Sequence, residues 1–254
     1  MFDFEALLVV ATLVTGIIVG IAWFVRRNRD PADAESIKEN WAVDMARSLF
    51  PVLLVVLVVR SFVVEPFRIP SGSMIPTLEV GDFILVNKSS YGVRLPITNQ
   101  RIFGDGEPER GDLAVFKYPQ NPRQDYIKRV IGVPGDHIVI LDKTLYVNGE
   151  AVPQVEVGQF NEGQDWGATV LEEQLGEVQY NILHYPGRTI GDGEYRVPEG
   201  HYFMVGDNRD RSADSRSWGY VSEELLVGRA FLIWMSWDGE NRRINWSRIG
   251  ERIR

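Results

Sequence analysis

Twenty consecutive residues without a charge, from Ala6 to Val25, constrain this chain more than any other feature of its sequence. At about 1.5 Å of rise per residue, a helix of that length spans about 30 Å, the thickness of the hydrocarbon core of a bilayer. Trp23 lies near one end, where aromatic side chains favour the membrane–water interface. The overall composition, 44% apolar and 24% charged, resembles that of a globular protein because it averages this segment with a polar remainder. We therefore predict a transmembrane helix over about residues 6–25.

The charges around this segment distinguish a retained anchor from a cleaved signal peptide. In a signal peptide the basic residues precede the apolar run. Here Asp3 and Glu5 precede it, and a run of arginines that begins at Arg26 follows it. We therefore expect residues 1–25 to remain as an anchor. Since basic loops stay in the cytoplasm, we expect the N-terminus outside and residues 26–48 inside the cell.

A second apolar run extends from Leu49 to Val64. It has 16 residues, which is short for a membrane span, and Arg60 interrupts it near its far end, where a long side chain can reach the headgroups. A buried strand is the alternative, since valine-rich runs also suit sheets. We favour a second transmembrane segment over residues 49–65, which makes residues 66–254 an exported domain.

The exported part of the chain has the pattern of a β-rich domain. Short runs of β-branched and aromatic residues are separated by Gly, Pro, Asn and Asp, as in strands joined by turns. The predicted strands are Phe83–Val86, Leu113–Tyr118, Tyr126–Val133, His137–Leu141, Tyr202–Val205 and Ala230–Trp234. Residues 151–195 are acidic and weakly patterned, which indicates a looser insertion or a small second lobe. Trp234 and Trp237 lie in an apolar run that suits either a core strand or insertion at the membrane interface.

Several classes of site are excluded by composition. The chain has no cysteine, which excludes disulfides, thiol nucleophiles, iron–sulfur clusters and cysteine-ligated zinc. Its three histidines make a histidine-rich metal site hard to build and leave a Ser-His-Asp triad without support. The net charge of −8 argues against nucleic-acid binding through bulk electrostatics. A serine nucleophile would need a base to activate it, and lysine is the remaining candidate.

One serine cluster and one lysine have the local context for such a pair. Ser71, Gly72 and Ser73 lie between two prolines, which restrict the backbone on both sides, although a Ser-Gly-Ser segment is more often a flexible turn. Lys128 lies in a strand pattern with apolar neighbours on both sides. Alternation sends Lys128 and Arg129 to opposite faces, so that one of them points to the core or to a cleft. Burial there would lower the pKa of a lysine from about 10.4 toward neutrality; a surface lysine is the alternative.

The segment from Gly206 to Arg216 is dense in Asp, Arg and Ser. It does not fit a calcium loop of the EF-hand type, because the required glycine and glutamate are missing from their positions. Two interpretations remain. The segment is either a solvated charged turn or a polar network in which opposed Asp and Arg side chains brace a site.

Five motifs of this chain, in this order, resemble those of bacterial signal peptidase I, also called leader peptidase. They are Phe67–Leu78, Gly81-Asp82, Arg110–Phe116, Asp125–Asp136 and Gly206–Arg216. The two apolar runs resemble the membrane topology of the family, and the resemblance covers nearly the whole chain except roughly residues 145–195. It implies a mostly β catalytic core with a smaller inserted β lobe, about residues 143–197, preceded by two transmembrane helices.

The resemblance also implies roles for individual residues. Ser73 matches the nucleophile and Lys128 the general base of a Ser/Lys dyad. The Ser71 hydroxyl matches the group that joins the Ser73 backbone N–H in an oxyanion hole. The residues that match those orienting the lysine and supporting the site are Ser212, Asp214 and Arg216. The walls of the substrate pockets are expected at Ile69, Met74, Leu78, Tyr126 and Ile127.

The implied function is the removal of signal peptides from exported preproteins, after small residues at A-x-A-like sites, on the periplasmic side of the bacterial inner membrane. The expected partners are preproteins, the lipid bilayer and, by proximity, the protein-export machinery; nucleic acid, metals and cofactors are not expected. A self-cleaving Ser/Lys regulator is one alternative, but it would carry a DNA-binding domain in place of the two apolar runs. A membrane-tethered binding module is the other, and it would not explain the serine–lysine pairing.

Overall fold

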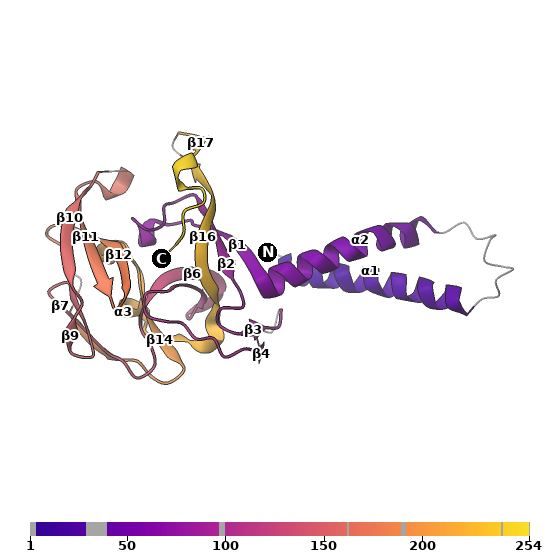
Figure 1. Ribbon diagram of the computed structural model, residues 1–254, viewed down its shortest axis with the longest axis horizontal. Helices are drawn as coiled ribbons and strands as arrows, with labels where there is room; N and C mark the ends of the chain where they lie inside the picture. Colours follow the sequence, from indigo (N-terminus) through magenta and orange to yellow (C-terminus); the bar gives the residue numbers. More distant parts are fainter. Residues whose placement is uncertain are drawn as a thin grey trace.

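Two apolar helices project from a β-rich body as an antiparallel hairpin in the computed structural model (Figure 1), which describes residues 4–28, 40–96, 100–161, 163–188, 192–239 and 241–253. Helix α1 spans Phe4–Arg27; α2 spans Trp41–Val58 and continues as a π-helical turn, η2, over Val59–Val63. Both are long and apolar enough to cross a membrane. A Cβ on Gly16 would lie 2.8 Å from the ring of Phe50, so this glycine lets the two helices approach closely.

The second helix is longer than the apolar run in the sequence suggests. It begins at Trp41, not at Leu49, and Asn40 caps it by accepting a hydrogen bond from the Ala42 backbone N–H at 3.2 Å. Its first two turns are mixed in polarity and therefore gave no apolar signal. The alternative of a buried strand is wrong for this segment. Of the predicted cytoplasmic loop, residues 29–39 lie outside the described part of the chain.

The body is built on one large antiparallel sheet. In the described part of the chain it has eight strands, in the order β1-β2-β16-β5-β6-β14-β15, with β17 paired to β16. These strands are β1 (Val64–Arg68), β2 (Asp82–Asn87), β5 (Leu113–Tyr118), β6 (Asn121–Gly132), β14 (His201–Val205), β15 (Val221–Ser222), β16 (Leu226–Asp238) and β17 (Arg243–Ile244). Strand β1 starts directly after η2, so the second apolar helix leads straight into an edge of this sheet.

The inserted lobe consists of two smaller antiparallel sheets. One has the order β13-β7-β8-β9 and the other β10-β11-β12. The strands are β7 (His137–Leu141), β8 (Thr144–Val147), β9 (Glu150–Ala151), β10 (Gln154–Phe160), β11 (Ala168–Leu175), β12 (Val178–His184) and β13 (Gly193–Arg196). Residues 151–195 are thus mostly strand and not a loose insertion. Their pattern is weak because most of β10 is exposed on both faces.

Short elements complete the chain. Strands β3 (Val93–Arg94) and β4 (Arg101–Phe103) form a small hairpin beside the end of the second helix (Figure 1). The short helical turns are η3 (Gly72–Met74), η4 (Gly163–Asp165), η5 (Arg209–Arg211), α3 (Ser215–Trp218), η6 (Glu223–Leu225) and η7 (Trp246–Arg248). Every strand predicted from the sequence is present, and the mostly β fold with a smaller lobe and two N-terminal helices is confirmed.

A buried ion pair fixes the lobe to the large sheet. Arg209 and Glu173 form a bidentate pair, with exposed fractions of 5% and 0%. The Tyr180 hydroxyl and the Gln154 amide, at 2.7 Å, also donate to Glu173. Burial by itself would raise the pKa of Glu173, but the Arg209 charge and these hydrogen bonds hold the pKa below its usual value. Glu173 is therefore ionised and fully partnered inside the protein.

We expect Glu173→Ala to lower the free energy of unfolding by about 3–5 kcal/mol, because it leaves the Arg209 guanidinium buried without its carboxylate. Thermal or denaturant unfolding of the detergent-solubilised protein measures this change. Glu156→Gln is the matched control, since Glu156 lies exposed on the neighbouring strand of the same lobe. A loss for Glu173→Ala no larger than that of the control would contradict the prediction.

Candidate active site

The candidate nucleophile lies on a single helical turn at the end of β1. The chain leaves β1 at Arg68, stays extended at Ser71 and then turns through η3. Within this turn Met74 is completely buried, while Ser73 is half-buried and faces a groove. Asn208 fixes this turn through two hydrogen bonds. Its backbone N–H donates to the Ser73 carbonyl oxygen at 3.1 Å, and its side-chain amide donates to the Gly72 carbonyl oxygen at 3.0 Å.

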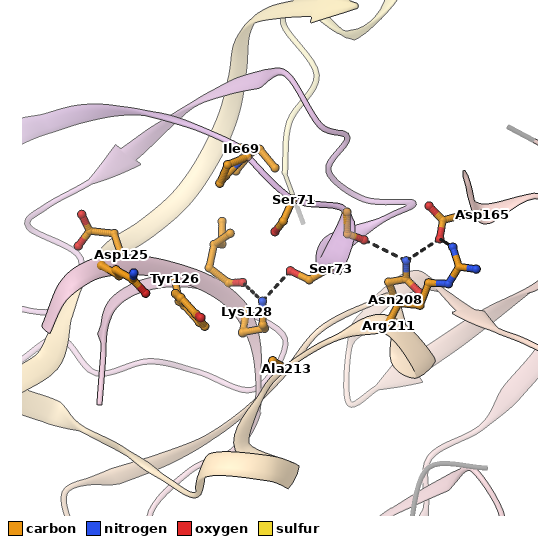
Figure 2. Close-up of a pocket in the computed structure, with 14 residues that line it drawn as sticks. Ile69, Ser71, Ser73, Asp125, Tyr126, Lys128, Asp165, Asn208, Arg211 and Ala213 are labelled. Atoms are coloured by element: carbon orange, nitrogen blue, oxygen red, sulfur yellow. Dashed lines mark hydrogen bonds and ion pairs between the residues drawn. The ribbon is translucent and has the colours of Figure 1, made fainter. Parts of the chain in front are cut away.

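The amine of Lys128 lies against the Ser73 hydroxyl. Lys128 comes from β6, and its Nζ donates to Ser73 Oγ at 2.7 Å and to the Ile127 carbonyl oxygen at 2.9 Å (Figure 2). The lysine is only 4% exposed. Two segments 55 residues apart in the sequence therefore bring a hydroxyl and a buried amine into hydrogen-bonding contact.

Burial makes this amine a usable base. Loss of solvation lowers the pKa of Lys128 to about 8, because the charged form is disfavoured away from water. The carboxylates of Asp214 and Asp207 oppose this change, and the Arg216 guanidinium adds to it. With a pKa of about 8, roughly a tenth of the molecules carry a neutral lysine at pH 7, compared with about one in a few thousand for an ordinary lysine.

Strand β6 buries its next residue as well, on the opposite face. Arg129 is fully buried and donates to both carboxylate oxygens of Asp207, at 2.9 and 2.7 Å, and to the Gly111 carbonyl oxygen at 2.7 Å. Its guanidinium also stacks on the Tyr180 ring at 3.7 Å. Alternation predicted that one of the two basic residues would point inward. Both are in fact buried, because each face of β6 is covered.

The segment from Gly206 to Arg216 forms the wall behind the lysine. Asp214 is fully buried, accepts from the Arg216 side chain at 2.7 Å and accepts from the Gly206 N–H at 3.0 Å. Burial would raise the pKa of Asp214, but the Arg216 guanidinium holds it below its usual value. Arg216 also donates to the Arg209 carbonyl oxygen at 2.7 Å. Of the two interpretations of this segment, the structure therefore favours a bracing network over a solvated turn.

A groove with a volume of about 690 Å³ runs across the two reactive groups. Its apolar walls include Ile69 and Tyr126 at one side of Ser73, and Ser71 lies on its surface beside Ser73 (Figure 2). Ile127 also lines the groove. Among the described residues, no group of three or more His, Cys, Asp or Glu side chains could hold a metal ion. The site thus combines a hydroxyl, a lysine of lowered pKa and an open groove, which together can perform acyl transfer.

The chain matches one peptidase family over most of its length. Residues 42–237 match the model of the family described as signal peptidase, peptidase S26. The chain is 45% identical to signal peptidase I of Pseudomonas aeruginosa and 44% identical to that of Pseudomonas fluorescens, in each case over 98% of both chains. It belongs to the S26 signal peptidase family. This S26 peptidase is therefore a serine endopeptidase.

Other matches carry the same description. Signal peptidase I of Haemophilus influenzae is 36% identical over 93% of this chain and 87% of its own length. A crystal structure of a signal peptidase I from Enterococcus faecalis V583 is 29% identical and covers 48% of this chain and 96% of its own, with a TM-score of 0.30. The family assignment depends on the sequence matches and not on that superposition.

Two predicted pocket residues of the S26 peptidase need correction. Met74 and Leu78 are each 0% exposed and belong to the core beneath the nucleophile turn, together with Ile84. The helical turn η3 points Ser73 and the residue that follows it in different directions, so Met74 cannot share the groove. Ile69, Tyr126 and Ile127 line the groove, and their role as walls of the substrate pockets stays a prediction.

Ser212 lies close to the nucleophile turn, and its role in orienting the lysine stays a prediction. Lys128 donates to Ile127 and not to Ser212. The Ser212 hydroxyl is buried, and its interaction with the Asp214 carboxylate helps to hold the pKa of Asp214 below its usual value. A Cβ on Gly206 would collide with this hydroxyl and with the Ser73 carbonyl oxygen, so Ser212 packs closely against the main chain that carries the nucleophile.

The two tryptophans of β16 are partly exposed. Trp234 is 42% exposed and packs edge-on against Phe83, with ring centroids 5.8 Å apart, and Trp237 is 39% exposed. Ile233, which directly precedes Trp234 in the strand, is buried in the core. The run is therefore a strand whose tryptophans face outward. Their insertion at a membrane interface stays a prediction.

Sequence reasoning missed three of the polar groups around the S26 site. Asp207 and Asn208 lie inside the charged segment, but nothing in their spacing showed which side chains turn inward. Asp165, on η4 of the lobe, also lines the groove. It lies in the weakly patterned part of the chain, which gave no signal at all.

We expect the Lys128 amine to titrate with a midpoint near pH 8 in the folded protein, because burial disfavours its ammonium form. The chain has five lysines, so ¹³C-lysine labelling yields few enough side-chain signals to follow by NMR, with Lys128→Met for assignment. Asp214→Asn removes a charge that raises the pKa of Lys128 and should move the midpoint below 8. A midpoint near 10.5, or an upward shift in Asp214→Asn, would contradict this account.

Proposed function

We propose that this S26 peptidase removes N-terminal signal peptides from exported preproteins by cleaving after small residues, with Ser73 as nucleophile and Lys128 as general base. One observation carries the assignment of the dyad: the buried Lys128 Nζ lies 2.7 Å from Ser73 Oγ at the floor of an open groove. The relatives named signal peptidase I, which match over 98% of this chain, support the substrate class.

The proposed reaction uses one proton that moves between the two residues. Neutral Lys128 accepts the Ser73 hydroxyl proton while Oγ attacks the carbonyl carbon of the scissile bond. The ammonium that forms then gives this proton to the leaving amine as the carbon–nitrogen bond breaks. Water attacks the resulting ester with Lys128 again as base, which releases the carboxylate and restores the serine.

The negative charge that develops on the carbonyl oxygen needs donors at a fixed position. We assign this role to the Ser73 backbone N–H and the Ser71 hydroxyl, which precedes the nucleophile by two residues and lies on the groove surface. Removing one such donor typically lowers the rate by about 10²–10³-fold. Asp214, Arg216 and Ser212 are proposed to hold the supporting loop in place.

The apolar part of the groove suits a substrate with small side chains. In an extended peptide alternate side chains face the same way, so the residues at A-x-A-like positions would point together toward the enzyme. Ile69, Tyr126 and Ile127 provide apolar walls near Ser73 that would limit the size of those side chains. Charged side chains would leave unpaired groups there and be rejected.

The position of Ser73 relative to the second helix suits a substrate that emerges from a membrane. Strand β1 follows η2 without a loop, and Ser73 comes ten residues after the end of η2 at Val63. We propose that residues 66–254 lie on the periplasmic side of the inner membrane, near the protein-export machinery, and that residues 26–48 face the cytoplasm.

Ser73→Ala and Lys128→Ala should each abolish cleavage of a preprotein, with a loss of at least about 10³-fold, because each removes a partner of the proton transfer. The purified protein in detergent is incubated with a preprotein, and the product is N-terminally sequenced to locate the cut. Ser89→Ala and Lys88→Ala, which lie outside the groove, are matched controls and should retain full activity. Full activity in either dyad variant would exclude the proposed dyad.

The absence of native cysteine makes the topology directly testable. In intact spheroplasts we expect a membrane-impermeant maleimide to label Ser89→Cys but not Ser36→Cys, and to label both after lysis. Labelling of Ser36→Cys in intact spheroplasts, with Ser89→Cys protected, would reverse the proposed orientation.

A further inference from the structure

The inserted lobe contributes one side chain to the groove, and the proposed dyad does not use it. Asp165 lies on η4 and is 7% exposed, yet it lines the groove near the nucleophile turn. The lobe also packs on that turn directly, because Ile75 is buried against Ala168, Leu183 and Tyr185. Asp165 is therefore held in place by the same contacts that fix the lobe to the catalytic core.

The two oxygens of Asp165 have different surroundings. Oδ1 accepts three hydrogen bonds: from the Tyr185 hydroxyl, from the Asn208 amide at 3.1 Å and from the Arg211 guanidinium at 3.0 Å. Within the described residues Oδ2 accepts none. A Cβ on Gly72 would lie 3.8 Å from Oδ2, so this oxygen lies beside the residue that precedes the nucleophile. Asp165 Oδ2 is thus held in a fixed position in the groove, where it can accept a hydrogen bond from a bound molecule.

The position of Asp165 along the groove indicates which part of a substrate it meets. In Figure 2 the groove has Tyr126 and Ile69 on one side of Ser73, and Asp165 and Arg211 on the other. Under the proposed function the small residues before the cut occupy the apolar side. The first residues of the mature protein must then leave along the side of Asp165.

We propose that Asp165 is a substrate-binding residue for the mature part of the preprotein: its Oδ2 accepts a hydrogen bond from the backbone N–H of the second residue after the cut. The inference rests on the proposed function. A backbone N–H is present whatever the mature sequence, so this contact suits an enzyme with many preprotein substrates. Because Oδ1 is already held by three donors, the acceptor needs no rearrangement when the substrate arrives.

The experiment compares two substrates that share the same signal-peptide residues. One peptide continues for four residues after the cut, and the other ends in a p-nitroanilide and has no mature segment. Asp165→Ala should lower kcat/KM about tenfold more for the long peptide than for the anilide, as expected for the loss of a hydrogen bond to a charged group. An equal loss on both substrates would show that Asp165 only braces the nucleophile turn, and an unchanged rate on both would also overturn the proposal.

A change in the substrate tests the same contact without altering the protein. N-methylation at the second residue after the cut should lower kcat/KM for the unaltered enzyme about tenfold, whereas N-methylation at the fourth should not. In Asp165→Ala the methyl group at the second residue should cause no further loss. Equal sensitivity to this methyl group in both enzymes would overturn the proposal.

Controls separate this inference from the proposed function. Glu156→Gln, an exposed carboxylate change in the same lobe, should leave both rates unaltered. Ser73→Ala should be inactive on the long peptide and on the anilide. Cleavage activity that persists in Ser73→Ala would contradict the proposed function itself. Loss of activity in Ser73→Ala together with unchanged rates in Asp165→Ala would contradict only the role of Asp165.

Discussion

The burial of one amine is the constraint on which the rest of the site depends. Taking the pKa of Lys128 from 10.5 to about 8 corresponds to a cost of about 3 kcal/mol in the folded state, because the protein must hold a group that prefers to be charged in water. The unfolded chain binds the extra proton between these two pKa values. The cost is therefore full below pH 8 and falls as the pH rises from 8 toward 10.5. A stable fold must offset it elsewhere, in the packed sheet and in the buried ion pairs nearby.

Those ion pairs allow desolvation to dominate the electrostatics at Lys128. Two carboxylates, Asp207 and Asp214, lie near the amine and would by themselves hold the proton on it. Asp207 is paired with Arg129 and Asp214 with Arg216, and each guanidinium offsets most of the effect of its carboxylate on the pKa of Lys128. An unpaired carboxylate in either position would raise the pKa of Lys128 and remove the base from neutral pH. Arginine suits this use because it stays protonated when it is buried.

Features that depend on a local sequence pattern could be predicted, whereas features that depend on contacts between distant segments could not. The helices and strands could be predicted because apolar length and alternation are local properties, and Lys128 could be selected because its neighbours along the strand are apolar. The start of α2 at Trp41 was missed because its first turns carry no apolar pattern. Met74 was misplaced because a single turn of helix, η3, decides which side chain faces the groove, and Leu78 because it packs in the core beneath that turn. Arg129, Asn208 and Asp165 depend on contacts between segments far apart in the chain, which no local pattern records.

The loop from Gly206 to Arg216 connects the stability of the lobe to the geometry of the site. Asn208 holds the carbonyl groups of Gly72 and Ser73, and the next residue, Arg209, is the buried partner of Glu173 in the lobe. A few residues later, Asp214 and Arg216 stand behind Lys128. Movement of the lobe would therefore displace the same loop that positions Ser73 and Lys128, the proposed nucleophile and base. Substitutions in the lobe are therefore tolerated only if its face toward this loop stays packed, since both Ser73 and Lys128 are positioned through that loop.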